Sequence, residues 1–324
     1  MSPRHKQGDA VDATVVITTK NRMDDLRVAI ESALRQTGNV EVVVVDDGST
    51  DGTSEMVKSD YPGVILDSHT DSTGYIPRRN RGARLARGEF VFSIDDDAEF
   101  SDKNSIADTI LEFQNCPRAG AIAIPCIDVK RSPDVRQPRP DDNHQYATSE
   151  FIGTAYAVRR DLFLQLGGFR ESLIHQGEER DFSIRLLNDG HVVLLGTAAP
   201  ILHHESPKRD TSRMDHYGRR NDVLFACQNL PWSALAPHLA MTSVNGIVFG
   251  LRCGRPLRML KGLCAGYISG LSLERVPVQN RAYRLYRKLR KNQCVSLAEI
   301  ENELEQIGAG HKNHDRIQLQ KLTT

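Results

Sequence analysis

Three consecutive carboxylates, Asp95, Asp96 and Asp97, follow the apolar run at residues 89–94. Adjacent anions repel one another, and this repulsion costs free energy where water is scarce unless a cation binds between them. Carboxylate oxygens favour Mg²⁺ or Mn²⁺, and such an ion keeps further positions for water and phosphate oxygens. The triplet therefore predicts a divalent metal site, with a solvated acidic turn as the open alternative.

The residues around the triplet predict strands that alternate with helices. Apolar, β-branched runs predict buried parallel strands at residues 13–19, 40–45, 64–66 and 89–94. Ligands of parallel sheets bind outside the carboxyl ends of the strands. The polar residues expected at one such crevice are Thr18, Thr19, Asp46, Asp47 and Asp95 to Asp97. The fold class is therefore α/β, with a Rossmann-like, mostly parallel sheet flanked by helices.

Composition restricts the partners and the location of the protein. The 324 residues contain 42 lysines and arginines and 42 aspartates and glutamates, so no net field recruits nucleic acid. The six cysteines have no metal-type spacing, which indicates a reducing, cytoplasmic location. The longest apolar stretch, residues 239–251, is interrupted by polar residues, and spanning a membrane takes ~20 apolar residues. The N-terminus at residues 1–12 is polar and lacks the apolar core of a signal peptide, so we expect no secretion signal there.

An ordered set of motifs resembles family 2 of the inverting nucleotide-sugar glycosyltransferases, which have the GT-A fold. The motifs are TTKNR at 18–22, DDGSTD at 46–51, RNxG at 79–82, the aspartate triplet, GGF at 167–169 and EExD at 178–181. The resemblance implies a GT-A catalytic domain at residues 13–210, with a nucleotide-binding half at about 13–100 and an acceptor half at about 101–210. A flexible N-terminus (1–12), a helical C-terminal extension (211–307) and a tail (308–324) complete the expected organisation.

The resemblance implies transfer of a sugar from a nucleotide-diphosphate donor to an acceptor hydroxyl, with inversion. UDP- or dTDP-sugars are the favoured donors, and a sugar, a lipid-linked molecule or a glycoconjugate is the acceptor. The cofactor would be Mn²⁺ or Mg²⁺, held by Asp97, Asp95 and one of two adjacent histidines, of which His203 is favoured over His204. Such a metal stabilises and orients the diphosphate leaving group.

The same resemblance assigns the nucleotide-sugar contacts. They are Thr18, Asn21, Arg22, Asp46, Asp47, Arg79, Asp95 and Asp96. A carboxylate at the end of the second strand can accept from N3–H of uracil or thymine, and we favour Asp46 for this contact. One of Asp46 and Asp47 is expected instead in an Asx-type turn with Gly48 and Ser49. Arg79 has the alternative of a surface ion pair.

The position of Glu179 in the family's motif implies that it is the catalytic base. Glu178 is the second candidate, and Asp181 would be a structural helper. Negative side chains at a helix start are ordinarily dipole partners, which is the alternative for Glu178. Glutamate replaces the usual aspartate of the family, and a site of this kind is sensitive to a ~1 Å misplacement. A non-catalytic nucleotide-sugar sensor or scaffold therefore stays open. A nucleotidyltransferase is a further alternative, although its glycine-rich loop is missing after the first strand.

The C-terminal extension contains a basic segment at residues 283–291. Apolar side chains alternate with lysines and arginines there, and such a segment can lie on an anionic membrane surface. Packing of a helix against the rest of the protein is the alternative interpretation. A peripheral contact with the inner face of the membrane is therefore left open. A short final helix is expected before the tail, because Ser296 and Glu299 have capping-box spacing.

Overall fold

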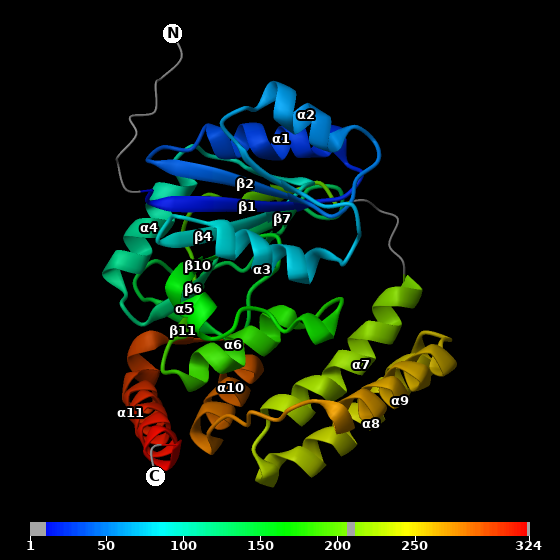
Figure 1. Ribbon diagram of the computed structural model, residues 1–324. Coiled ribbons are helices and arrows are strands. Elements are labelled where there is room, and N and C mark those ends of the chain that lie inside the picture. Colours follow the sequence, from blue (N-terminus) through cyan, green and yellow to red (C-terminus); the bar gives the residue numbers. More distant parts are fainter. Residues whose placement is uncertain (1–10, 206–210, 323–324) are drawn as a thin grey trace. The chain divides into compact units, whose positions relative to one another are not determined.

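The computed structural model describes residues 11–205 and 211–322 (Figure 1), with side chains described to residue 310. Two compact units divide these residues. Unit 1 contains the described parts of Met1–Arg139, Ile152–Gln165 and Leu195–Glu205. Unit 2 contains the described parts of Pro140–Phe151, Leu166–Leu194 and Ser206–Thr324. Residues 1–10 of the predicted flexible N-terminus lie outside the described residues.

Unit 1 is built on a mostly parallel sheet, as the alternating pattern predicted. Along the sheet the strands are β6 (Ala119–Ala123), β10 (Tyr156–Arg159), β4 (Phe90–Asp95), β1 (Ala13–Thr19), β2 (Val40–Asp46) and β3 (Ile65–Ser68). Strand β1 pairs in parallel with β2 and β4, and β2 pairs in parallel with β3. Strand β10 runs antiparallel to β4 and β6. The carboxyl ends of β1, β2 and β4 therefore meet at one edge.

The connections of unit 1 create a crevice at that edge. The chain moves outward from β1 through α1 (Met23–Leu34), β2 and α2 (Thr53–Asp60) to β3, then returns through α3 (Tyr75–Leu85) to β4. Right-handed crossovers place α3 on the face opposite α1 and α2, as Figure 1 shows. The direction of winding thus reverses between β1 and β4. Ligands of open α/β sheets bind at such a reversal, outside the carboxyl ends.

A second, small sheet brings a distant segment to this edge. Its strand order is β5 (Ala98–Phe100), β12 (Ile201–His203), β7 (Cys126–Asp128) and β8 (Val135–Arg136). In this sheet His203 is the register partner of both Ala98 and Asp128. Helices α4 (Ser105–Asn115) and α5 (Arg160–Gln165) complete unit 1. Strand β12 thereby places His203 beside the residues that follow β4.

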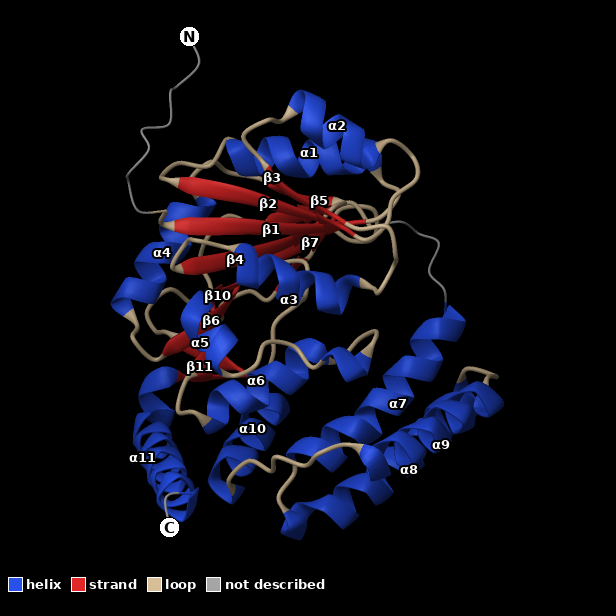
Figure 2. Cartoon of the chain, in the orientation of Figure 1, coloured by secondary structure: helices blue, strands red, loops and turns tan. Residues whose placement is uncertain are grey.

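Unit 2 is mainly helical, as Figure 2 shows in blue. Its elements are β9 (Tyr146–Thr148), a 3₁₀ turn at Glu171–Leu173, α6 (Glu178–Asn188), β11 (Val192–Leu195), α7 (Thr211–Asn229), α8 (Trp232–Arg252), α9 (Pro256–Ser272), α10 (Asn280–Asn292), β13 (Cys294–Ser296) and α11 (Leu297–Leu322). Strand β9 pairs antiparallel with both β11 and β13. The rings of Phe151, Phe169 and Phe182 pack together with centroids 5.8 to 6.4 Å apart.

The two units differ from the predicted domain boundaries. We expected a catalytic domain at 13–210 and a separate helical extension, but residues 140–151 and 166–194 group with the C-terminal helices. The reason is non-local pairing, because β13 adds to the edge of β9 and α6 packs against α10 and α11. The final helix also continues past residue 308, where a tail was expected. Its side chains Ile300, Leu304 and Ile307 are buried, and such packing stabilises a helix over many turns.

Two C-terminal helices bear on the question of membrane contact. The apolar side chains of the basic helix α10 are buried, including Tyr283, Leu285, Tyr286 and Leu289, so this helix packs within unit 2. Helix α8, by contrast, is 21 residues long and is apolar enough to cross a membrane by length and composition alone. From the sequence we expected polar residues to interrupt the apolar stretch at residues 239–251. The polar residues of α8, among them His238, Thr242, Ser243 and Asn245, nevertheless lie within one continuous helix.

Candidate functional site

The end of β4 and the end of β12 form a cluster of possible metal ligands. Asp95, Asp97 and His203 each offer one ligand atom, and these atoms lie within 4.8 Å of one another. The Nε2 atom of His203 is 3.3 Å from Oδ1 of Asp97. Two carboxylates and an imidazole can hold Mn²⁺ or Mg²⁺ with positions left for phosphate oxygens. The structure thus brings together the three residues that were predicted as metal ligands.

The pKa values of the neighbouring residues Asp96 and Asp97 are shifted in opposite directions. Burial raises the pKa of Asp96 to about 7, although the charge of Arg22 and a hydrogen bond from Thr19 oppose this shift. Burial also acts to raise the pKa of Asp97, but a hydrogen bond from His203 and the charge of Arg22 outweigh it and lower the pKa to about 2. Asp97 is therefore an anion at neutral pH, which is the form that binds a metal.

The loop after β1 supplies a cation to the triplet. The Nη1 atom of Arg22 lies 2.5 Å from Oδ2 of Asp97 and 3.2 Å from Oδ1 of Asp96. The hydroxyl of Thr19 donates to Oδ2 of Asp96 over 2.9 Å. Asn21 has a positive φ of 53°, a conformation that asparagine tolerates better than most residues. Its Oδ1 atom accepts from the N–H of Thr50 over 2.7 Å, which ties this loop to the loop after β2.

Both acids at the end of β2 already accept several hydrogen bonds. Oδ1 of Asp46 accepts from the N–H of Ser49 at 2.9 Å and from its hydroxyl at 2.6 Å, which is an Asx-type turn. Its other oxygen accepts from Ser54. Asp47 accepts from Arg78 and from donors of the 72–74 loop. The contact between Asp46 and the nucleotide base thus stays a prediction. It requires the hydroxyl of Ser49 or Ser54 to give up its hydrogen bond to Asp46.

Arg79 and Thr18 lie next to Asp95. The Nη2 atom of Arg79 is 2.6 Å from Oδ1 of Asp95, and the guanidinium lies 4.7 Å from the centre of the Tyr75 ring. The Arg79 side chain is buried, so the surface ion-pair alternative does not describe it. Thr18 and Asp95 are register partners across β1 and β4. These three residues therefore share the crevice at the strand ends.

The predicted base lies at the start of α6. Glu178 is buried and Glu179 is partly exposed, directly after Gly177, which has a φ of 87°. Asp181 is fully buried and accepts from Arg170, Arg185 and Asn229, which agrees with a structural role. Helix α6 belongs to unit 2, whereas the metal cluster belongs to unit 1. The assignment of Glu179 or Glu178 as the base stays a prediction.

Asp128 and Glu205 are potential site residues that the sequence reasoning missed. Together with His203 they form a second group whose ligand atoms lie within 4.8 Å of one another. Oδ1 of Asp128 is 2.8 Å from Nδ1 of His203, and its Oδ2 accepts from Arg136 over 2.8 Å. Burial acts to lower the pKa of His203, but the hydrogen bonds to Asp97 and Asp128 raise it. An acid at the end of a short apolar segment was the available signal for Asp128.

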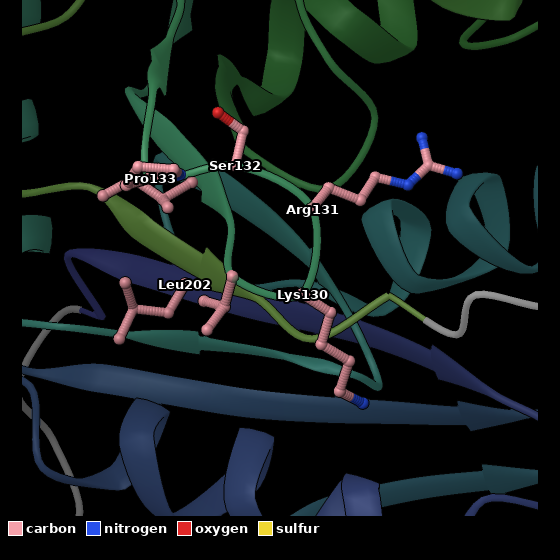
Figure 3. Close-up of a pocket in the computed structure, with 7 residues that line it drawn as sticks. Lys130, Arg131, Ser132, Pro133 and Leu202 are labelled. Carbon is pink, nitrogen blue, oxygen red and sulfur yellow. The ribbon is translucent and has the colours of Figure 1, made fainter.

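A cavity of about 420 Å³ lies beside the small sheet (Figure 3). Ile127 and Leu202, which are register partners, contribute to its lining together with the 129–133 segment. Successive residues of a strand point to opposite faces, so these two side chains face away from Asp128 and His203. Lys130 and Arg131 extend in different directions in Figure 3. The cavity is therefore separate from the metal cluster.

Asp128→Ala is expected to weaken Mn²⁺ binding about 10- to 100-fold, because a carboxylate that orients a metal-bound histidine is removed. Titration calorimetry with MnCl₂ on the full chain measures the change. Asp134→Ala is the matched control, since Asp134 is exposed and bonds to Ser132. An equal dissociation constant for wild type and Asp128→Ala would contradict the positioning role.

Asp96→Asn is expected to stabilise the metal-free protein at high pH. The pKa of Asp96 is raised in the folded state, so the folded protein retains a proton that the unfolded chain releases between about pH 4 and 7. Wild-type stability therefore falls as pH rises through this window, and asparagine removes that loss. Urea unfolding with a chelator should show a gain of roughly 4 kcal/mol near pH 8 and little gain near pH 4. The control is Asp134→Asn. An equal gain at both pH values would contradict the expectation.

Comparisons with known proteins agree with this geometry. Residues 14–170 match the family model described as Glycosyl transferase family 2. The uncharacterized glycosyltransferase YibD of Escherichia coli is 38% identical over 90 residues, which are 26% of each chain. An uncharacterized glycosyltransferase of Haemophilus influenzae is 25% identical over 186 residues, covering 54% of this chain and 62% of that protein. The chain thus spans about a quarter to three fifths of the length of these relatives.

Solved structures share the fold. S. aureus TarS 1–349 in complex with UDP-GlcNAc has a TM-score of 0.58 at 18% identity, covering 94% of this chain and 92% of that one. Mannosyltransferase PcManGT of Pyrobaculum calidifontis, in complex with GDP-Man and Mn²⁺, has a TM-score of 0.53 at 20% identity. That match covers 94% of this chain and 88% of the other. At this identity the likeness shows a GT-A fold.

Proposed function

Residues 14–170 match the model of glycosyl transferase family 2, and from this premise we propose that the protein transfers a sugar from a nucleotide-diphosphate donor to an acceptor hydroxyl. The observation that carries the proposal is the group Asp95, Asp97 and His203 at the carboxyl ends of the strands. Its position at the reversal of winding is where nucleotides bind in open α/β sheets.

The donor set fits a divalent metal. Oxygen ligands predominate, Asp97 is ionised at neutral pH, and His203 is oriented by Asp128. Asp97, Asp95 and His203 would hold Mn²⁺ or Mg²⁺, which when bound stabilises negative charge on the departing diphosphate. Arg22 would add a positive charge beside the same group, because its guanidinium already reaches Asp96 and Asp97.

For the nucleotide we propose a UDP- or dTDP-sugar. Asp46 would accept from N3–H of the base, and the other donor contacts would come from Thr18, Asn21, Arg22, Asp47, Arg79, Asp95 and Asp96. The TarS complexes contain UDP or UDP-GlcNAc, which supports a uridine donor, whereas PcManGT contains GDP-Man. A thermal-shift panel of nucleotide sugars with and without Mn²⁺ discriminates these donors, because a bound ligand raises the apparent stability.

For the acceptor step we propose Glu179 as general base, with Glu178 as second candidate. A carboxylate would take the proton of the acceptor hydroxyl as that hydroxyl attacks the anomeric carbon opposite the diphosphate, which gives inversion. The acceptor class proposed is a growing polysaccharide, a glycolipid or another glycoconjugate. The names of two relatives support it, the succinoglycan biosynthesis protein ExoO of Rhizobium meliloti and the O-antigen biosynthesis protein RfbC of Myxococcus xanthus.

One observation favours a second candidate function, a nucleotide-sugar sensor without turnover. Glutamate stands at the proposed base position, where the motif usually has aspartate. Assays of nucleoside diphosphate release separate the two functions. Slow, Mn²⁺-dependent release from UDP-, dTDP- or GDP-sugars supports the transferase, and binding of a nucleotide sugar with no release from any of them supports the sensor.

A further inference from the structure

Large apolar side chains are exposed along α8 and α9. Trp232 is 73% exposed, Leu257 and Ile268 are each 71% exposed, and Leu271 is 90% exposed. Further exposed apolar side chains of the two helices are Met241, Val244, Ile247, Val248, Leu251 and Leu260. Soluble proteins rarely leave so many large apolar side chains in one region of the surface without a partner. We call this set of side chains the α8–α9 face.

Most of these side chains lie outside the contacts between the helices, although the guanidinium of Arg275 lies 4.2 Å from the centre of the Trp232 ring. Helices α7, α8 and α9 lie side by side in Figures 1 and 2, and glycines contribute to their contacts together with the buried Met259 and Leu263. A Cβ added at Gly262 would lie 2.6 Å from the carbonyl oxygen of His216, and one at Gly266 would lie 2.7 Å from that of Arg220. These glycines let α9 approach α7 closely. The apolar side chains on the other side of the helices are therefore left for an external partner.

The charges of this segment identify the chemistry of that partner. Residues 232–273 contain four lysines and arginines and no aspartate or glutamate, although the whole chain is electrically balanced. The four are Arg252, Arg255, Arg258 and Lys261, around the turn between the two helices. Arg255 pairs with Asp215 over 2.8 Å, and the other three are exposed. An apolar face bordered by cations complements a surface that is apolar inside and anionic at its boundary.

We propose that the α8–α9 face docks on an anionic lipid bilayer, with both helices in the plane of the headgroups. The apolar side chains enter the boundary of the acyl chains, and Arg252, Arg258 and Lys261 meet lipid phosphates. A second copy of the chain is the less suitable occupant, because pairing two such faces would bury cations without any acid to match them.

Docking in the plane, and not spanning, follows from the other side of α8. Gly246 of α8 packs against Arg219 of α7, where an added Cβ would lie 3.3 Å from Cδ of that arginine. The Arg219 guanidinium is 5.9 Å from the centre of the Phe249 ring and 3.0 Å from Asp222. Charged groups of this kind are costly inside hydrocarbon. Helix α8 would therefore present one face to lipid, while its other face remains packed against α7 and the charged side chain of Arg219.

Trp232 is the only tryptophan of the chain and provides a direct probe. We expect its emission to shift to shorter wavelength when phosphatidylcholine vesicles containing phosphatidylglycerol are added to the full chain. Brominated acyl chains in the same vesicles should quench it. High salt should weaken the binding, because exposed charges are screened. Pure phosphatidylcholine vesicles should bind much more weakly, and equal binding to both vesicle types would overturn the anionic part of the proposal.

Matched variants assign the binding to the α8–α9 face. The triple variant R252Q/R258Q/K261Q is expected to bind anionic vesicles roughly 100-fold more weakly. The double variant I268S/L271S should weaken binding and reduce the spectral shift. The control R281Q/R284Q/K291Q removes the same charge from exposed positions of α10 and should bind like wild type. Circular dichroism and gel filtration of every variant verify that the fold is kept.

Three results would overturn the proposal. The first is an equal loss of binding in the α10 control, which would indicate attraction by general positive charge. The second is a Trp232 spectrum that does not change with any vesicle. The third is concentration-dependent dimerisation in the absence of lipid that I268S/L271S abolishes, which would make the face an interface between copies. None of these measurements uses sugar transfer, so they stand apart from a test of the proposed function.

Discussion

Asp97→Ala is expected to lower metal-dependent sugar transfer about a thousandfold, since the loss of several kcal/mol of charge stabilisation by a metal corresponds to that factor. Asp97 is a buried anion with its pKa lowered to about 2, so it is the member of the triplet best prepared to bind a cation. Initial rates of nucleoside diphosphate release, measured over a range of MnCl₂ concentrations, provide the test.

The neighbouring Asp96→Asn variant is the control for this effect. Burial raises the pKa of Asp96 to about 7, so the wild-type side chain is partly neutral already, and asparagine has a similar shape. We expect Asp96→Asn to keep its dependence on Mn²⁺, in line with a group that binds no metal, and any fall in its rate to come from weaker donor binding. If Asp97→Ala keeps the wild-type rate at every concentration of Mn²⁺, the metal assignment is wrong.

Glu179→Gln is expected to lower the rate of transfer by about 10² to 10⁴ and to leave donor affinity nearly unchanged. An amide cannot accept the proton of the acceptor hydroxyl, while the shape of the side chain is kept. Donor binding is measured by calorimetry and transfer by product formation. Glu179→Asp retains a carboxylate and should therefore transfer sugar much faster than Glu179→Gln, which distinguishes a chemical role from a structural one.

Glu178→Gln identifies which of the two adjacent acids is the base. Glu178 is buried within the first turn of α6, and Glu179 is the more accessible of the two. We expect Glu178→Gln to affect the free energy of unfolding more than the rate of transfer. A folded Glu178→Gln protein without transfer, together with an active Glu179→Gln protein, would move the base to Glu178.

The parallel half of the fold was predictable because its signals are local. Each β-branched run is followed by a helix of ordinary length, so successive carboxyl ends reach the same edge of the sheet. Thr18, Asp46 and Asp95 could therefore be grouped from the order of the elements alone. The left-handed position of Asn21 and the burial of Arg79 beside Asp95 were not visible, because they depend on contacts between separate loops and elements.

The residues that orient the proposed metal ligands were not predictable to the same extent. The hydrogen bond between Asp128 and His203 joins residues 75 positions apart, through the pairing of β7 with β12. No periodicity in either segment specifies that pairing. Likewise, whether Asp46 or Asp47 forms a turn depends on which donors surround each carboxylate. The Asx-type turn at Asp46 became clear only from its bonds to Ser49.

The C-terminal helices show the same limit. The basic stretch in α10 and the apolar stretch in α8 were both recognised as amphipathic or apolar, but composition could not say which of them is buried. In the structure the apolar side chains of α10 are buried, whereas many of those of α8 and α9 are exposed. The glycines of α9 decide this, because they allow α7 to approach one side of the helix closely.

The amino-acid sequence by itself determined the order of strands and helices in the nucleotide-binding half, the acids at its strand ends and the family motifs. Hydrophobic periodicity and turn residues involve only a few neighbouring positions, so they can be recognised in the sequence without knowledge of the fold. The tertiary structure alone decided the division into two units, the orientation of His203 by Asp128 and the exposure of the α8–α9 face. Each of these depends on pairing between segments far apart in the chain, and that pairing is selected by the packing of the whole fold.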